Sequence, residues 1–125
     1  MDGKSHVKFV SKPWGHELIW AHTEHYVGKV LHIKAGQALS VQYHNQKDET
    51  IHLLRGEMIY RVDLKDGRGL VEVPFALGES YRNTPGVIHQ MEAVTDCDVL
   101  EASTPHLDDV VRLSDRYGRE GTSAP

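Results

Sequence analysis

The sequence has little of several features that would assign it to a special class of protein. Its 125 residues include one cysteine, Cys97, so no disulfide can form within the chain, and the surrounding TDCD gives no metal or nucleophile pattern. No stretch approaches the roughly 20 apolar residues of a membrane span, and the amino terminus lacks the apolar run of a signal peptide. We therefore expect an inert cysteine and a cytoplasmic protein with no membrane partner.

The chain also lacks a strong excess of charge of either sign. Its 14 Lys and Arg residues and 18 Asp and Glu residues give a formal net charge of −4, without the basic surplus of a nucleic-acid-binding protein. We expect small-molecule partners and no nucleic acid. Hydrophobic residues make up 39% and charged residues 26%, which is typical of a soluble globular protein, and the length suits one domain.

Short extended runs separated by Gly, Pro, Asn and Asp make up most of the chain. Apolar and polar residues alternate within these runs, as in strands, and almost no segment has apolar residues at helical spacing. The expected strands lie within residues 28–36, 38–44, 49–57, 58–64, 71–77, 80–94 and 98–105. This pattern predicts an all-β barrel over about residues 10–104, then a short helix or arm at 105–119 and a frayed tail at 120–125.

Four polar side chains in these runs form a candidate metal site. Gln42 and His44 are two residues apart on one expected strand and therefore share a face. Glu49 follows after the NQKD turn, and His89 comes just after a tight turn. A single histidine on an apolar strand is more often a hydrogen-bonded core residue than a ligand. Two imidazoles, a carboxylate and an amide oxygen together, however, suit one divalent transition metal ion, zinc first, with Mn, Fe, Co or Ni as alternatives.

The joint spacing of these residues and of nearby glycines resembles the two signature motifs of the cupin superfamily. The residues that carry the resemblance are Gly36, Gln42, His44, Glu49, Gly56, Gly78, Pro85, Gly86 and His89. It implies that residues 1–125 form a single cupin domain, a double-stranded β-helix or jelly-roll barrel. It also implies that the four polar residues are the metal ligands.

The resemblance is closer to the type II mannose-6-phosphate isomerases, whose cupin domain is often fused behind a GDP-mannose pyrophosphorylase. The segment LSVQYHNQKDE is similar to the family's L-S-L-Q-x-H-x-x-R-x-E, and KPWG is similar to its R-P-W-G. The carboxyl-terminal DDVVR and DRYGR resemble its D-D-I-V-R and D-x-Y-G-R. Lys29 and Glu101 match its lysine before the first motif and the glutamate of its I-E-V-Q strand. The resemblance spans about residues 10–119.

The sequence departs from this family near the site. Asn45, Gln46 and Thr50 stand where the family commonly has His, and Ala93 replaces its usual Asn. Gln90 stands where the family has an Arg directly after the last metal-binding His. Because a guanidinium can clamp a phosphate with two hydrogen bonds, we expect a weaker grip on phosphate here.

The resemblance implies a metal-dependent aldose–ketose isomerase of sugars or sugar phosphates, with a role in carbohydrate metabolism. Such chemistry needs a Lewis acid on an oxygen and a group that moves a proton between adjacent carbons. We expect Lys29 and Glu101 to be catalytic, because each is in phase with barrel-facing residues. Lys47, Tyr81 and Met91 are the expected substrate-binding residues.

Two other functions remain compatible with the residues. One is a cupin oxygenase that uses iron or manganese on a small organic molecule, although a full set of three histidines would favour it more than the set with Gln42. The other is a module that binds a small ligand with help from the metal and does not catalyse. A small barrel with exposed edge strands also favours a homodimer.

Overall fold

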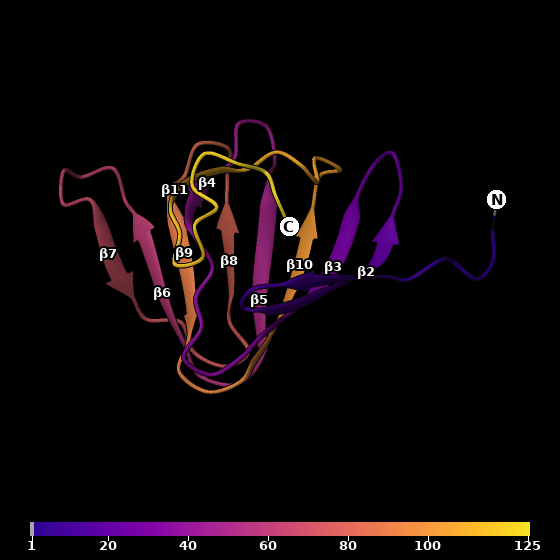
Figure 1. Ribbon diagram of the computed structural model, residues 1–125, viewed down its shortest axis with the longest axis horizontal. Coiled ribbons are helices and arrows are strands. Elements are labelled where there is room, and N and C mark those ends of the chain that lie inside the picture. Colours follow the sequence, from indigo (N-terminus) through magenta and orange to yellow (C-terminus); the bar gives the residue numbers. More distant parts are fainter. Residues whose placement is uncertain (1) are drawn as a thin grey trace.

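The computed structural model describes residues 2–125, and within them the chain forms eleven strands and no helix. Two antiparallel sheets face each other (Figure 1). The larger sheet has the strand order β1 (Lys8–Lys12), β2 (Gly15–His22), β3 (Val27–Ile33), β10 (Cys97–Ser103), β5 (Glu49–Arg55) and β8 (Ser80–Asn83). The smaller sheet has the order β11 (Val111–Ser114), β4 (Val41–Tyr43), β9 (His89–Ala93), β6 (Met58–Asp63) and β7 (Leu70–Val73). The all-β prediction is confirmed, and none of the described residues forms a membrane-spanning helix.

The apolar core lies between the two sheets because alternate residues of each strand point inward. Leu31 and Ile33 of β3 face Tyr60 and Val62 of β6 across this core, and all four are at most 1% exposed. Burial of a large apolar side chain stabilises the fold by about 1.5–3 kcal/mol. The core also contains the free Cys97, and burial raises the pKa of its thiol to about 11, which keeps it protonated.

The carboxyl-terminal arm, residues 105–119, contains the strand β11, where the sequence left a helix or an irregular arm open. Its strand β11 pairs with β4, with Arg112 opposite Gln42. The β-branched Val110 and Val111 favour an extended backbone, and the short β4 leaves an edge that β11 can pair. In Figure 1 the yellow arm lies beside β4 and β9 at one end of the barrel. The arm therefore borders the interior at that end.

Candidate metal centre and pocket

Three predicted ligands, His44, Glu49 and His89, converge inside the barrel. His44 directly follows β4, Glu49 begins β5 and His89 begins β9, so both sheets contribute. Glu49 Oε1 lies 2.7 Å from His44 Nε2 and 3.6 Å from His89 Nε2. The three ligand atoms all lie within 4.8 Å of one another, and each side chain is at most 5% exposed. This cluster has the dimensions and the donor types of a metal centre.

Backbone pairing holds this geometry and sets the place of the fourth predicted ligand. Gly86 adopts a φ of 87°, a left-handed conformation that favours glycine, and its N–H donates to the carbonyl of His44 at 2.7 Å. Gln42 pairs directly with His89 across β4 and β9, so the two side chains share the inner face. Ser40 Oγ donates to Gln42 Oε1 at 2.9 Å. The ligand role of Gln42 stays a prediction.

Hydrogen bonds on the far side of each imidazole fix its tautomer. Nδ1 of His44 donates to the carbonyl of Asp109 at 2.6 Å, and Nδ1 of His89 donates to the carbonyl of Val87 at 2.9 Å. Each Nε2 then presents a lone pair to the interior. Within residues 2–125 neither Nε2 nor Glu49 Oε1 has a hydrogen-bond partner. Buried lone pairs turned toward each other are costly, and a cation between them would satisfy all three atoms.

The charge states at the centre also suit a cation. Burial raises the pKa of Glu49, but the nearby Lys47 ammonium and the neighbouring His44 and His89 together more than offset this and hold the pKa well below its usual range. Burial lowers the pKa of His89, so its imidazole is neutral at neutral pH. An ionised carboxylate and a neutral imidazole are the forms that bind a metal ion.

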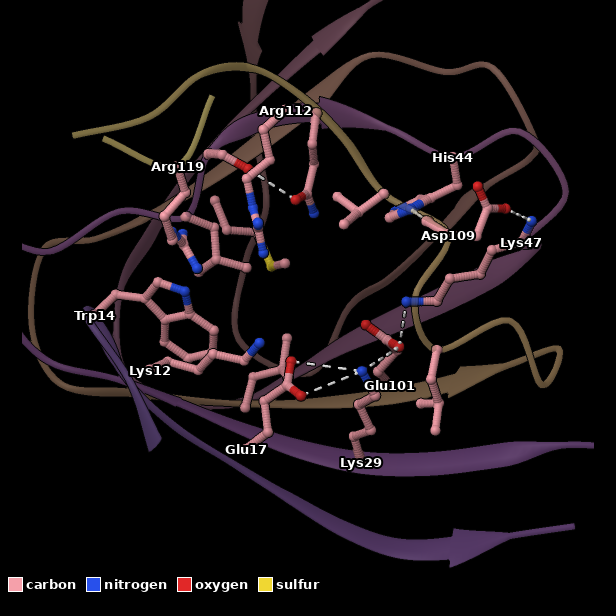
Figure 2. Close-up of a pocket in the computed structure, with 17 residues that line it drawn as sticks. Lys12, Trp14, Glu17, Lys29, His44, Lys47, Glu101, Asp109, Arg112 and Arg119 are labelled. Atoms are coloured by element: carbon pink, nitrogen blue, oxygen red, sulfur yellow. Dashed lines mark hydrogen bonds and ion pairs between the residues drawn. The ribbon is translucent and has the colours of Figure 1, made fainter. Parts of the chain in front are cut away.

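A polar cavity of about 70 Å³ opens beside His44, which is room for a few water molecules. Figure 2 shows the side chains that surround it. It is lined by four of the predicted catalytic and substrate-binding residues, Lys29, Glu101, Lys47 and Met91. It is also lined by Lys12, Trp14, Glu17, Leu31, Leu39, Ser40, Gln42, His44, Leu107, Asp109, Val110, Arg112 and Arg119.

A chain of buried ion pairs runs along one wall of the cavity. Lys47 Nζ lies 2.9 Å from Glu101 Oε2 and 4.0 Å from Glu49 Oε1. Lys29 Nζ lies 3.9 Å from the same oxygen of Glu101 and 3.3 Å from Glu17 Oε1. Lys29 of β3 pairs directly with Glu101 of β10, which agrees with the inward positions that the alternation predicts. Figure 2 shows Glu101 between the two lysines, facing the cavity, so it is a well-placed proton acceptor.

The other side of the cavity carries an excess of positive charge, from residues that the sequence did not identify as part of the site. Lys12, Arg112 and Arg119 lie there, away from His44 (Figure 2). Arg119 pairs with Asp115 at 2.9 Å, whereas Arg112, 7% exposed, has no partner for its Nε in the described part of the chain. Burial and the charge of Arg119 lower the pKa of Arg112. Nη1 of Arg112 donates to the carbonyl of Thr122 at 2.9 Å, but among the described residues no carboxylate pairs with this guanidinium, so it is suited to bind an anionic group.

Two other residues from the sequence analysis lie elsewhere. Tyr81 packs against Tyr60, with ring centroids 5.0 Å apart, and it does not line this cavity. Gln90 alternates with His89 and Met91, so its side chain points out of the barrel and accepts a hydrogen bond from Arg61 at 3.0 Å. An arginine at position 90 would also point out of the barrel, away from the cavity. In this fold, the absence of an arginine at position 90 therefore does not remove a phosphate-binding group from the cavity.

Comparisons with known proteins identify the architecture. No protein-family model and no curated protein sequence matches the chain. Among solved structures, the capsular polysaccharide assembling protein CapF from Staphylococcus aureus superposes with a TM-score of 0.76 at 17% identity. That match covers 90% of this chain and 33% of CapF, so the chain spans about a third of CapF's length.

Two smaller proteins are similar over most of their own length. An RmlC-like cupin protein from Desulfovibrio desulfuricans has 27% identity and a TM-score of 0.58, with 78% of this chain and 83% of that chain covered. KdgF from Halomonas sp. has 17% identity and a TM-score of 0.61, with 82% and 89% covered. At these identities the likeness concerns the fold, and it agrees with the two facing sheets. The chain has the cupin fold, a double-stranded β-helix.

Proposed function

We propose that this protein is a metal-dependent aldose–ketose isomerase that acts on a sugar or sugar phosphate, in the manner of the mannose-6-phosphate isomerases. The observation that carries the proposal is the position of Glu101. This buried carboxylate faces a cavity that also contains His44 of the metal centre, and two lysines hold it in place. An isomerase needs such a base beside a Lewis acid.

His44, Glu49 and His89 would hold the metal ion, with Gln42 as the fourth protein ligand. When bound, zinc or a similar ion polarises the substrate carbonyl as a Lewis acid. The cavity starts at His44, so a small substrate there lies between the ligands and Glu101.

Glu101 and Lys29 divide the proton transfers of the reaction. Glu101 removes the proton from the carbon beside the carbonyl, and the released electron pair forms the double bond of an enediol. The same carboxyl group then returns the proton to the former carbonyl carbon. The hydroxyl proton passes to the former carbonyl oxygen by way of Lys29, so atoms and charge balance. Lys47 lies 2.9 Å from Glu101, and the charge of Glu101 helps to raise the pKa of Lys47 against the effect of burial.

The positive side of the cavity favours a substrate with an anionic group. Lys12 and Arg112 lie across the cavity from His44, where they can bind a phosphate or carboxylate at the far end of the sugar. This arrangement supports a sugar phosphate, because a neutral sugar would leave the charge of the buried Arg112 without an anionic partner and would not need its free Nε.

The test is a panel of aldoses, ketoses and their phosphates, followed by NMR in D₂O with metal-loaded protein. We expect interconversion of one pair, with deuterium at the carbon beside the carbonyl. Glu101→Gln should lower turnover by about a hundredfold or more with unchanged metal content, while the exposed Glu57→Gln should have no effect. Binding without proton exchange would establish a binding module instead, and oxygen consumption by the iron-loaded protein would establish an oxygenase.

A further inference from the structure

Asp109 of the carboxyl-terminal arm forms hydrogen bonds with His44 and with the loop that connects His44 to Glu49. Its carboxylate accepts hydrogen bonds from three consecutive backbone N–H groups of the ligand loop, residues 45–47, at 3.0, 2.6 and 2.9 Å. Its own backbone carbonyl accepts the Nδ1–H of His44 at 2.6 Å. Within the described chain, one residue of the arm thus holds both His44 and the loop that leads from it to Glu49.

The contact with the carbonyl decides which nitrogen of His44 carries the proton. With Nδ1 protonated, Nε2 presents a lone pair to the metal centre. In the other tautomer Nε2–H would donate to Glu49 Oε1, which lies only 2.7 Å away. That hydrogen bond would occupy two ligands at once and would compete with a metal ion. The position of the Asp109 carbonyl therefore selects the form of His44 that can bind.

The same arm also forms a wall of the cavity. Leu107, Val110 and Arg112 line it together with Asp109. Ligand sites are commonly about 300 Å³ or larger, whereas this cavity measures about 70 Å³, so a sugar requires the wall to shift. The arm forms the wall that pairs with the short β4, and its Asp109 carbonyl bonds His44, so a shift of the arm would alter that hydrogen bond.

We propose that Asp109 is a positioning residue, which docks the arm on the ligand loop, fixes the Nδ1–H tautomer of His44 and thereby sets the metal affinity of the site. The inference rests on the metal centre of the proposed function and adds its regulation by the arm. Because coupling is reciprocal, metal binding tightens the arm to the same extent that arm docking tightens the metal.

The test compares zinc affinity in three proteins by competition with a chromophoric chelator. Asp109→Asn removes the charge and one of the two acceptor oxygens, and we expect zinc to bind about tenfold or more weakly. Asp108→Asn removes the same charge from the exposed neighbouring residue and should change zinc affinity by less than about twofold. Equal affinities of wild type and Asp109→Asn would overturn the inference while leaving the metal centre intact, whereas no zinc binding by the wild type would overturn the proposed function as well.

Two further measurements use the wild type and therefore do not depend on whether a variant folds. In wild-type protein without metal, NMR of the imidazole nitrogens should show His44 as the Nδ1–H tautomer, and a dominant Nε2–H form would overturn the inference. Addition of zinc to the wild type should slow hydrogen exchange at the amides of residues 45–47, because metal binding and arm docking support each other. Exchange that zinc does not change would equally overturn it.

Discussion

Lys47 holds the buried carboxylates of the pocket, and its replacement by methionine tests the electrostatics of the site. Lys47 is 5% exposed and contacts Glu101 and Glu49 at 2.9 and 4.0 Å. Methionine keeps much of the aliphatic volume of lysine but removes the positive charge that lies beside both carboxylates. Removal of one partner from a buried ion pair costs about 3–5 kcal/mol. We therefore expect the Tm of Lys47→Met to fall by about 10–20 °C in metal-free protein.

The pH dependence of this loss has a definite sign. In the wild type, Lys47 together with His44 and His89 outweighs burial and lowers the pKa of Glu49, so the contribution of this carboxylate to stability is present at neutral pH and is lost as pH falls through the folded pKa. Without Lys47, burial is opposed only by His44 and His89, so the folded pKa of Glu49 is higher than in the wild type and the variant loses less stability on acidification. The difference in Tm between wild type and variant should therefore shrink as pH falls below about 5.

The assay is thermal unfolding followed by circular dichroism, with a chelator present. Lys34→Met is the matched control, because Lys34 is exposed, and its effect should stay within about 0.5 kcal/mol. The reasoning is refuted if Lys47→Met is as stable as Lys34→Met, or if its deficit does not depend on pH.

Two other substitutions test the site. Gln42→His should keep about one metal ion per chain by elemental analysis, because an imidazole on the same strand face can reach the ion, and complete metal loss would count against Gln42 as a ligand. Arg112→Gln should weaken the binding of inorganic phosphate by about 10- to 100-fold in calorimetric titration, since a charge-assisted hydrogen bond is lost. Arg116→Gln, at an exposed arginine of the same arm, serves as the control, and equal phosphate affinity in the two variants would exclude the cationic side of the cavity as the anion site.

Local patterns were sufficient to predict the strands and most of the site. Alternation in residues 27–33 and 97–103 places Lys29 and Glu101 on the inner face, where the structure has them as cross-strand partners. Spacing on one strand likewise placed Gln42 and His44 on one face, whereas His89 was identified from its joint spacing with the other motif residues. These predictions succeed because the direction of a side chain on a strand depends on its neighbours in sequence.

Contacts between distant segments were not accessible in the same way. The role of Arg112 depends on the pairing of β11 with β4, which joins segments about 70 residues apart and has no strong pattern of its own. Asp109 reaches His44 through the same long-range packing. The weaker grip on phosphate was predicted from Gln90 by family position alone, although the alternation of Gln90 with His89 already predicts an outward side chain.

His44, Glu49 and His89 are proposed to form a metal centre. The most direct test of this centre is the metal content of purified and reconstituted protein by elemental analysis, for the wild type, His44→Ala and His52→Ala. His52 lies on the outer face of the sheet, where it contacts Ser80, and is the matched control. We expect close to one transition metal ion per chain in the wild type and in His52→Ala, and loss of most of it in His44→Ala. A wild type that holds no metal even after reconstitution would contradict the account.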